Sequence, residues 1–210
     1  MSTSVTLPAD KTSRYVGFMT AAEYFAWERQ DATNQRYEFA AGKVFAVAGA
    51  SPEHNHICFA TARAFDGRLE AAGVNCATMV ADQKVYVRPG RYIYPDALIV
   101  CGDEQYDDND ALRNPFVAIE VLSPSTQVSD RTDKLREYKQ IETLRHYILI
   151  EQDRPSVMHY EKLPSGLWAV VGDYTDLADA LRLTLSGAEI TVPLARVYRR
   201  VTFPAAHETV

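Results

Sequence analysis

One segment of this chain, Pro115–Leu122, constrains its fold more than any other. The eight residues read PFVAIEVL and are almost wholly apolar. A strand that is apolar on both sides must be covered on both sides, as in the sheets of α/β proteins. The segment therefore predicts a central strand of an α/β fold, and Glu120 is its one exception.

The composition agrees with one folded domain and limits the kinds of partner. The chain has 210 residues, of which 47% are hydrophobic and 24% charged, as in ordinary globular domains. The net charge of −6 and the pI near 5.4 exclude binding of nucleic acid through bulk positive charge, so any contact with DNA must be local. A local basic rim could come from six cations, which could equally belong to an ordinary soluble surface: Lys43, Lys84, Arg88, Arg91, Arg131 and Lys134.

Features that indicate a cellular compartment are few. No stretch approaches the length of a membrane span, so we expect no membrane contact, and residues 1–11 contain no apolar run of signal-peptide length. The three cysteines, Cys58, Cys76 and Cys101, form no Cys-x-x-Cys pair. We interpret them as buried thiols in a reducing compartment and expect a cytoplasmic protein.

Local signals place the first elements. Thr20 and Glu23 form a capping box that predicts a helix over residues 21–30. Alternation around Ala41-Gly42 predicts a hairpin over residues 36–47. Ser51 followed by proline predicts a helix that runs towards Gly73.

The remaining pattern completes a single domain. We predict strands at 76–80, 83–87, 93–100 with a bend at Pro95, and 146–150, a helix over 130–141, and four short strands after residue 150. Residues 15–200 form one predicted domain, with a core to about residue 150 and a β-rich tail after it. Residues 1–14 and 201–210 are predicted to be flexible ends.

Two carboxylates, Asp96 and Glu120, interrupt apolar strands. A buried carboxylate is costly unless it is paired, hydrogen-bonded or bound to a cation. Two of them on neighbouring strands suggest a metal site, although neutralisation by an arginine or capping of a turn explains the pattern equally well. A serine hydrolase site at Ser123 or Ser125 is excluded because the glycine elbow of such enzymes is missing.

Several motifs together resemble the putative restriction endonuclease domain family of the PD-(D/E)XK nuclease superfamily. The resemblance covers about residues 15–150 and continues more faintly to about residue 198. Its most specific part is the string from Ile119 to Thr126, IEVLSPST, and a proline-aspartate pair alone would be weak evidence. The other matching parts are Tyr37-Glu38 with Gly42, Ser51 with His54 or His56, Tyr94-Pro95-Asp96, Asp130 with Lys134 and Tyr138, and Leu144-Arg145-His146-Tyr147.

The resemblance implies a fold and a reaction. The expected fold is a restriction-endonuclease-like core, a mixed central sheet flanked by helices, followed by the β-rich tail. The expected reaction is metal-dependent hydrolysis of DNA phosphodiester bonds. Asp96, Glu120 and the backbone carbonyl of Val121 would hold Mg²⁺, or Mn²⁺ in its place.

The chain departs from the superfamily pattern at the catalytic lysine. That lysine should stand two residues after Glu120, where this chain has Leu122. The family resemblance assigns the missing cation to Lys134; a solvated surface lysine is the alternative. Glu38 could assist the metal or be an exposed strand residue. His54 is only a possible contributor, since such a histidine is more often a capping or packing residue.

Two further expectations concern the whole protein. A domain that keeps this fold without catalysis, to bind DNA or a protein partner, is the alternative function. We also expect a homodimer, because short apolar strands such as 181–185 need covered edges and because nucleases of this superfamily often place two active sites symmetrically on a duplex. If those strands pack against the chain's own sheet instead, a monomer results.

Overall fold

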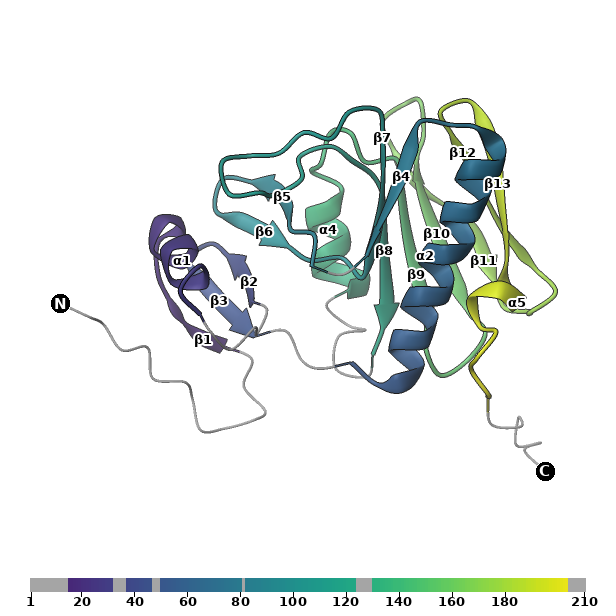
Figure 1. Ribbon diagram of the computed structural model, residues 1–210, viewed down its shortest axis with the longest axis horizontal. Coiled ribbons are helices and arrows are strands. Elements are labelled where there is room, and N and C mark those ends of the chain that lie inside the picture. Colours follow the sequence, from purple (N-terminus) through teal and green to yellow (C-terminus); the bar gives the residue numbers. More distant parts are fainter. Residues whose placement is uncertain (1–14, 32–36, 47–49, 81, 124–129, 204–210) are drawn as a thin grey trace.

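The fold is built on a mixed six-stranded sheet (Figure 1). A computed structural model describes residues 15–31, 37–46, 50–80, 82–123 and 130–203. In these residues the central sheet has the order β11 (Trp168–Tyr174), β10 (Val157–Lys162), β9 (His146–Glu151), β8 (Pro115–Leu122), β7 (Ala97–Cys101) and β4 (Cys76–Val80). Its strands are antiparallel except for the parallel pair β8 and β9. The predicted mixed central sheet is confirmed.

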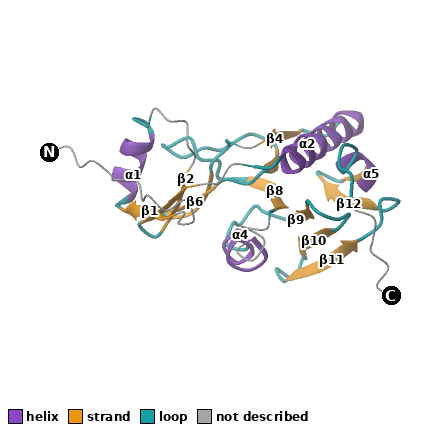
Figure 2. Ribbon diagram, turned by 90° about the horizontal axis from the view of Figure 1, so that it is seen from below, coloured by secondary structure: helices purple, strands orange, loops and turns teal. Residues whose placement is uncertain are grey.

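Both faces of the central sheet are covered. On one face lie the long helix α2 (Pro52–Ala72), the hairpin of β12 (Ala180–Leu185) and β13 (Ala188–Pro193), and the short helix α5 (Leu194–Val197). On the other face lies the segment with the π-helical turn η1 (Asp130–Lys134) and helix α4 (Leu135–Tyr138). Figure 2 shows α2 and α4 on opposite sides of the sheet. Alternate residues of β8 enter the two cores, Val117 and Ile119 in one and Ala118 in the other, which explains its apolar sequence.

A second sheet forms the N-terminal part of the molecule, to the left in Figure 1. Its order is β1 (Tyr15–Phe18), β3 (Lys43–Ala46), β2 (Tyr37–Ala40), β6 (Arg91–Ile93) and β5 (Val85–Arg88). Helix α1 (Ala21–Glu28) packs on it through Tyr24, which is fully buried and stacks on Phe39 with ring centroids 5.0 Å apart. The aromatic side chains of α1 thus belong to the core.

The local signals of the sequence are confirmed. Thr20 and Glu23 form the reciprocal capping box at the start of α1. Ala41 and Gly42 both have positive φ, 49° and 86°, as the tight turn between β2 and β3 requires. Helix α2 begins after Ser51, whose side chain accepts a hydrogen bond from the His54 amide. It ends at Gly73.

Two predicted elements are wrong in extent. The strand predicted over 93–100 is two strands, β6 and β7, which belong to different sheets. Pro95 has no amide hydrogen for a ladder, so the chain leaves one sheet there and enters the other. The helix predicted over 130–141 is only the η1 turn followed by α4, although Tyr138 and Ile141 are buried as their spacing indicates.

The segment after residue 150 is rich in strands, as expected, but these strands lie in two places. β10 and β11 extend the central sheet beyond β9, and β12 and β13 form the separate hairpin. The predicted flexible ends, residues 1–14 and most of 201–210, lie outside the described residues, as do residues 124–126 of the IEVLSPST string.

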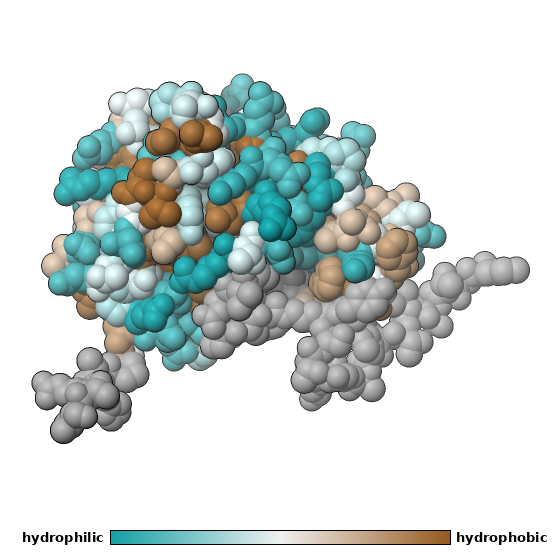
Figure 3. Space-filling model, turned by 180° about the vertical axis from the view of Figure 1, so that it is seen from behind, coloured by the Kyte–Doolittle hydropathy of each residue, from teal (hydrophilic) through white to brown (hydrophobic). Residues whose placement is uncertain are grey.

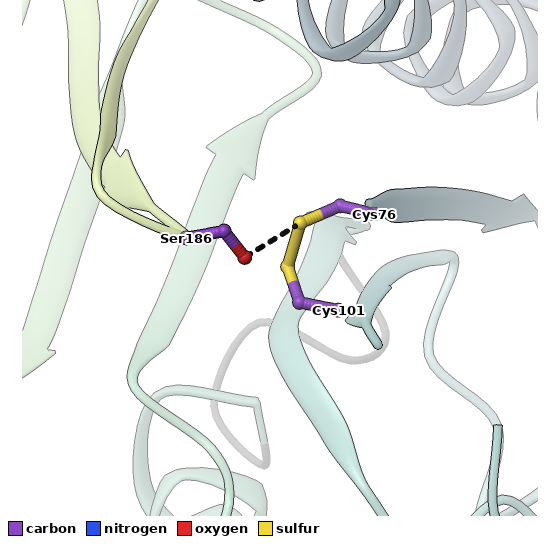
Figure 4. Close-up of a disulfide and its surroundings, with 3 residues drawn as sticks. All are labelled: Cys76, Cys101 and Ser186. Carbon is purple, nitrogen blue, oxygen red and sulfur yellow. Dashed lines mark hydrogen bonds between the residues drawn. A yellow bond between two sulfur atoms is a disulfide. The ribbon is translucent and has the colours of Figure 1, made fainter. Parts of the chain in front are cut away.

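The expectation of three free thiols is wrong for two of them. Cys76 on β4 and Cys101 on β7 form a disulfide, and Cys58 is free and half-buried (Figure 4). The two residues are cross-strand partners at one end of an antiparallel pair, with Cα atoms 4.0 Å apart. Their separation of 25 residues hides this pairing from any local reading of the sequence.

No helix in the described part of the chain is both long and apolar enough to cross a membrane.

Candidate functional site

Asp96 and Glu120 lie at the same end of two neighbouring inner strands of the central sheet, β7 and β8. Ala97 is the cross-strand partner of Ile119, so Asp96 lies just before β7 beside the last residues of β8. The Val121 amide donates a 2.7 Å hydrogen bond to Asp96 Oδ2. The side chain of Glu120 is only 3% exposed and that of Asp96 22%. The two carboxylates predicted from the sequence are therefore brought together.

Pro95 limits the ladder hydrogen bonds between β7 and β8 next to Asp96. Continuing the β7–β8 register by two residues would place Pro95 opposite Val121. Proline cannot donate a ladder hydrogen bond to the Val121 carbonyl. The amide and the carbonyl of one strand residue point to the same side, and the Val121 amide points to Asp96. The Val121 carbonyl thus faces the side on which Asp96 lies.

Lys134 reaches this site from the η1 turn. Its Nζ lies 3.2 Å from both carboxylate oxygens of Glu120, and its side chain is 12% exposed. The parallel pairing of β8 and β9 requires a crossover on the face of the sheet, which carries η1 back over the end of β8. The structure therefore turns Lys134 inward, against the alternative of a solvated surface lysine.

Glu38 completes a charged network around Lys134. Its Oε1 lies 3.4 Å from Lys134 Nζ, and its Oε2 lies 4.0 Å from Arg91 Nη1. Its side chain, 18% exposed, is half-buried rather than exposed. Glu38 belongs to β2 of the N-terminal sheet, so residues from two sheets meet at this ammonium group.

Tyr138, which matches the family motif but has no role in the predicted site, is a neighbour of Glu120. It is fully buried on α4, and its hydroxyl donates a 2.7 Å hydrogen bond to Glu120 Oε1. Burial, together with the negative charge of Glu120, raises the pKa of the Tyr138 phenol well above its usual value, so the hydroxyl remains a donor. Its helical spacing hid this role, because a buried tyrosine is normally explained by packing alone.

His54 and Cys58 line the other side of Asp96. His54 Nε2 lies 3.3 Å from Asp96 Oδ2, and His54 Nδ1 lies 3.4 Å from Cys58 Sγ. The neighbouring His56 is exposed. Burial and the charges of Asp96 and Glu120 raise the pKa of the Cys58 thiol. The thiol is therefore protonated at neutral pH.

Comparison with known proteins assigns the chain to a family. The sequence model of the Uma2 family, described as "Putative restriction endonuclease", matches residues 21–193. The chain belongs to this family. That membership confirms the resemblance noted from the IEVLSPST string and the residues around it.

Two relatives of this chain come from Synechocystis sp. (strain ATCC 27184 / PCC 6803 / Kazusa). The protein named "Uncharacterized protein sll1609" is 32% identical over 71% of this chain and 84% of its own length. The protein named "Uncharacterized protein slr1290" is 27% identical over 88% of this chain and 94% of its own length. A crystal structure described as a putative nuclease belonging to DUF820, from Anabaena variabilis ATCC 29413, superposes with a TM-score of 0.65. It covers 86% of this chain and 98% of its own, at 15% identity, and it supports the restriction-endonuclease-like fold.

The donor atoms at this Uma2-family site fit a small, hard cation. Asp96 and Glu120 offer carboxylate oxygens and Val121 a carbonyl oxygen, the ligand type that Mg²⁺ and Mn²⁺ prefer. His54, Cys58 and Asp96 also have ligand atoms within 4.8 Å of one another. A thiol is a soft ligand that Mg²⁺ does not prefer, so the oxygen donors are the better set.

Proposed function

We propose that this protein is a Mg²⁺-dependent nuclease that hydrolyses phosphodiester bonds in DNA, with Mn²⁺ able to replace Mg²⁺. The observation that carries the proposal is the convergence of Asp96, Glu120 and the Lys134 ammonium group at one end of strands β7 and β8. Carboxylates beside a lysine are the groups that phosphodiester hydrolysis needs, and family membership supports the same reaction class.

Each group has a separate role in the proposed site. Asp96, Glu120 and the Val121 carbonyl would hold the metal, which when bound polarises the scissile phosphate and lowers the pKa of a coordinated water. Lys134 orients the attacking water or offsets the negative charge that grows on the phosphate in the transition state. Glu38 holds the Lys134 ammonium from the far side and could assist the metal. His54, in contact with Asp96, positions that carboxylate.

A second candidate is a domain that binds DNA or a protein partner without catalysis. The charge balance around Glu120 favours it, because Lys134 and Tyr138 already satisfy this carboxylate through hydrogen bonds. Such a network would keep the fold intact without a metal. The absence of a lysine at position 122 agrees with this candidate as well.

Cleavage of supercoiled plasmid DNA by the purified chain tests the proposal. We expect nicked and linear products with Mg²⁺ or Mn²⁺, none with EDTA, and none from Glu120→Ala or Glu120→Gln. Glu189→Gln is the matched control, because Glu189 is an exposed acid on the β13 hairpin. If the wild type leaves the plasmid intact with both metals, the non-catalytic candidate replaces the nuclease.

A further inference from the structure

An arginine-lined groove lies between helices α2 and α5. It has a volume of about 260 Å³, and every charged residue that lines it is an arginine: Arg63, Arg68, Arg196 and Arg199. All four arginines are exposed. In a chain whose net charge is −6, a groove of this kind is a local exception to the overall charge.

The cations that we expected to form a basic rim are mostly not available. Five of these six side chains form ion pairs: Lys84 with Glu28, Arg88 and Arg91 with Glu137, Arg131 with Glu151, and Lys134 with Glu120. A cation that is paired with a carboxylate contributes little attraction for a further anion. Among these six, Lys43 alone forms no ion pair in the described part of the chain, so the predicted rim offers little free positive charge.

The groove arginines are not neutralised in this way. In the part of the chain that the structure describes, none of the four forms an ion pair with an acidic side chain. Guanidinium groups bind phosphate oxygens through two parallel hydrogen bonds and are weakly hydrated, so unpaired arginines are well suited to a phosphate backbone.

Small residues form the floor of the groove. Ala60, Ala64 and Gly67 follow one another at helical spacing along α2 and line it together with Pro193. Their short side chains leave the groove open, so that arginines from both helices can approach a bound chain. Arg63 and Arg68 are five residues apart, about 7.5 Å along the helix axis, which corresponds to about two nucleotide steps of a DNA strand.

Helix α2 also connects the groove to the candidate active site. His54, in the first turn of α2, contacts Asp96, and Arg63 follows nine residues later. At about 1.5 Å per residue, Arg63 lies about 14 Å from His54 along the axis and Arg68 about 21 Å. These distances correspond to about four to six base pairs of rise in B-DNA. Nine residues are about two and a half helical turns, so Arg63 and His54 lie on opposite sides of α2, and a duplex held in the groove lies on the far side of this helix from the carboxylates.

We infer that this groove is a docking site for the phosphate backbone of duplex DNA, separate from the catalytic carboxylates. The inference rests on the proposed function only in taking DNA as the substrate. The arginines supply a local attraction for phosphate that the net charge of the chain does not, and they hold the duplex without reading its sequence, because phosphate contacts carry no base information.

Binding of a fluorescein-labelled 20-base-pair duplex, measured by anisotropy without divalent metal, tests the inference. The background is Glu120→Gln, so that no strand is cut. Changing all four groove arginines to glutamine should weaken binding at least tenfold at low salt. It should also lower the slope of log K against log salt concentration by about one for each arginine that contacts a phosphate.

A matched control carries the same loss of charge elsewhere. It replaces four exposed arginines outside the groove with glutamine: Arg29, Arg136, Arg154 and Arg182. We expect its affinity and salt slope to stay within about twofold of the parent. Equal binding by the groove variant and the parent, an equal loss in the control variant, or no binding by the parent would each overturn the inference.

The outcomes separate this inference from the proposed catalysis. Arginine-dependent binding by a wild-type protein that never cuts plasmid would keep the docking site and remove the nuclease. Metal-dependent cleavage, together with DNA binding that does not depend on the four arginines, would support the nuclease proposal and rule out the docking site.

Discussion

At the scale of single residues, the chemistry depends on how the charge of Glu120 is balanced. The carboxylate is nearly inaccessible to solvent, and it receives hydrogen bonds from Lys134 and Tyr138. A bound cation would enter an electrostatic environment already set by an ammonium group. Two changes, one to the acids and one to the lysine, separate metal binding from catalysis.

Removing the two acids should remove the metal site. In Asp96→Asn/Glu120→Gln the oxygen ligands lose their charge, so we expect affinity for Mn²⁺ to fall by about a hundredfold or more. Isothermal titration calorimetry measures this, with Glu189→Gln as the control. Unchanged Mn²⁺ affinity in the double variant would show that the acids are not ligands.

Removing the lysine should affect the reaction and spare the metal. Lys134→Ala deletes a positive charge beside Glu120, so Mn²⁺ should bind at least as tightly as in the wild type. Cleavage should fall by about a hundredfold to a thousandfold, the usual effect of losing one group that stabilises transition-state charge. Lys139→Ala, at an exposed lysine just after α4, is the control. Cleavage at the wild-type rate by Lys134→Ala would restrict Lys134 to a structural role.

At the scale of elements, two cross-strand pairs show what strand register contributes. One is the pair of histidines between β9 and β10, where His146 Nδ1 lies 3.0 Å from His159 Nε2. The other is the disulfide between β4 and β7. The paired residues are 13 and 25 positions apart in the sequence, and each pair leads to a measurable property.

The histidine pair should make the protein sensitive to acid. Burial lowers the pKa of His146 to about 4 and, helped by His146, that of His159 to about 3. The unfolded chain takes up these protons near pH 6.5 and the folded chain does not. The contribution of the two histidines to the free energy of unfolding is therefore fully present above pH 6.5 and is lost as the pH falls towards 4. The loss is on the order of 3 kcal/mol for His146.

Urea unfolding between pH 7 and pH 4 measures this loss of stability. His146→Gln should make the free energy of unfolding depend less on pH than in the wild type. His56→Gln, which changes an exposed histidine, should leave that dependence unchanged. Parallel curves for the wild type and His146→Gln would contradict the prediction.

The disulfide should limit the number of free thiols to one. Alkylation of the unfolded protein without reductant should label Cys58 alone, and reduction should raise the count to three, as mass spectrometry can show. Closing a loop of this length is worth about 3 kcal/mol, so reductant should lower the melting temperature of the wild type but not that of Cys76→Ser/Cys101→Ser. Three labelled cysteines without reductant would show that the bond does not form. That result would fit the cytoplasmic location, which stays a prediction.

At the scale of the whole molecule, the question is how the free edges of its β-sheets are covered. The leucines of β12, which we expected to need a partner, are buried in the chain's own core at Leu181, Leu183 and Leu185. β11, in contrast, is at the end of the central sheet and exposes Val170 and Val171. Figure 3 shows hydrophobic patches on the half of the molecule that carries this sheet.

Because β12 is covered by the chain's own core, the strand-based support for a homodimer comes from β11 alone, and we propose that the homodimer forms through the edge of β11. Light scattering at micromolar concentration should give a particle of twice the 23.5 kDa chain mass. Val170→Lys places a charge at this edge and should yield monomers, whereas Phe59→Lys, at an exposed site on α2, should leave the dimer intact. A wild-type particle with the mass of one chain would rule the dimer out.

The sequence by itself determined the elements with local causes. The capping box at Thr20, the turn at Ala41-Gly42 and the limits of α2 at Ser51 and Gly73 were all predictable, because each depends on residues within a few positions of one another. The apolar β8 with its single acid was predictable as well, since burial on both faces appears directly in the composition of a strand.

Only the tertiary structure decided which distant residues meet. The separation of residues 93–100 into two sheets, the Cys76–Cys101 bond and the hydrogen bond from Tyr138 to Glu120 all depend on register and crossover between segments far apart in the chain. The family resemblance indicated Lys134, but packing of the crossover turned it inward to Glu120. Burying an acid required a partner, and local sequence does not specify which cation the fold brings to it.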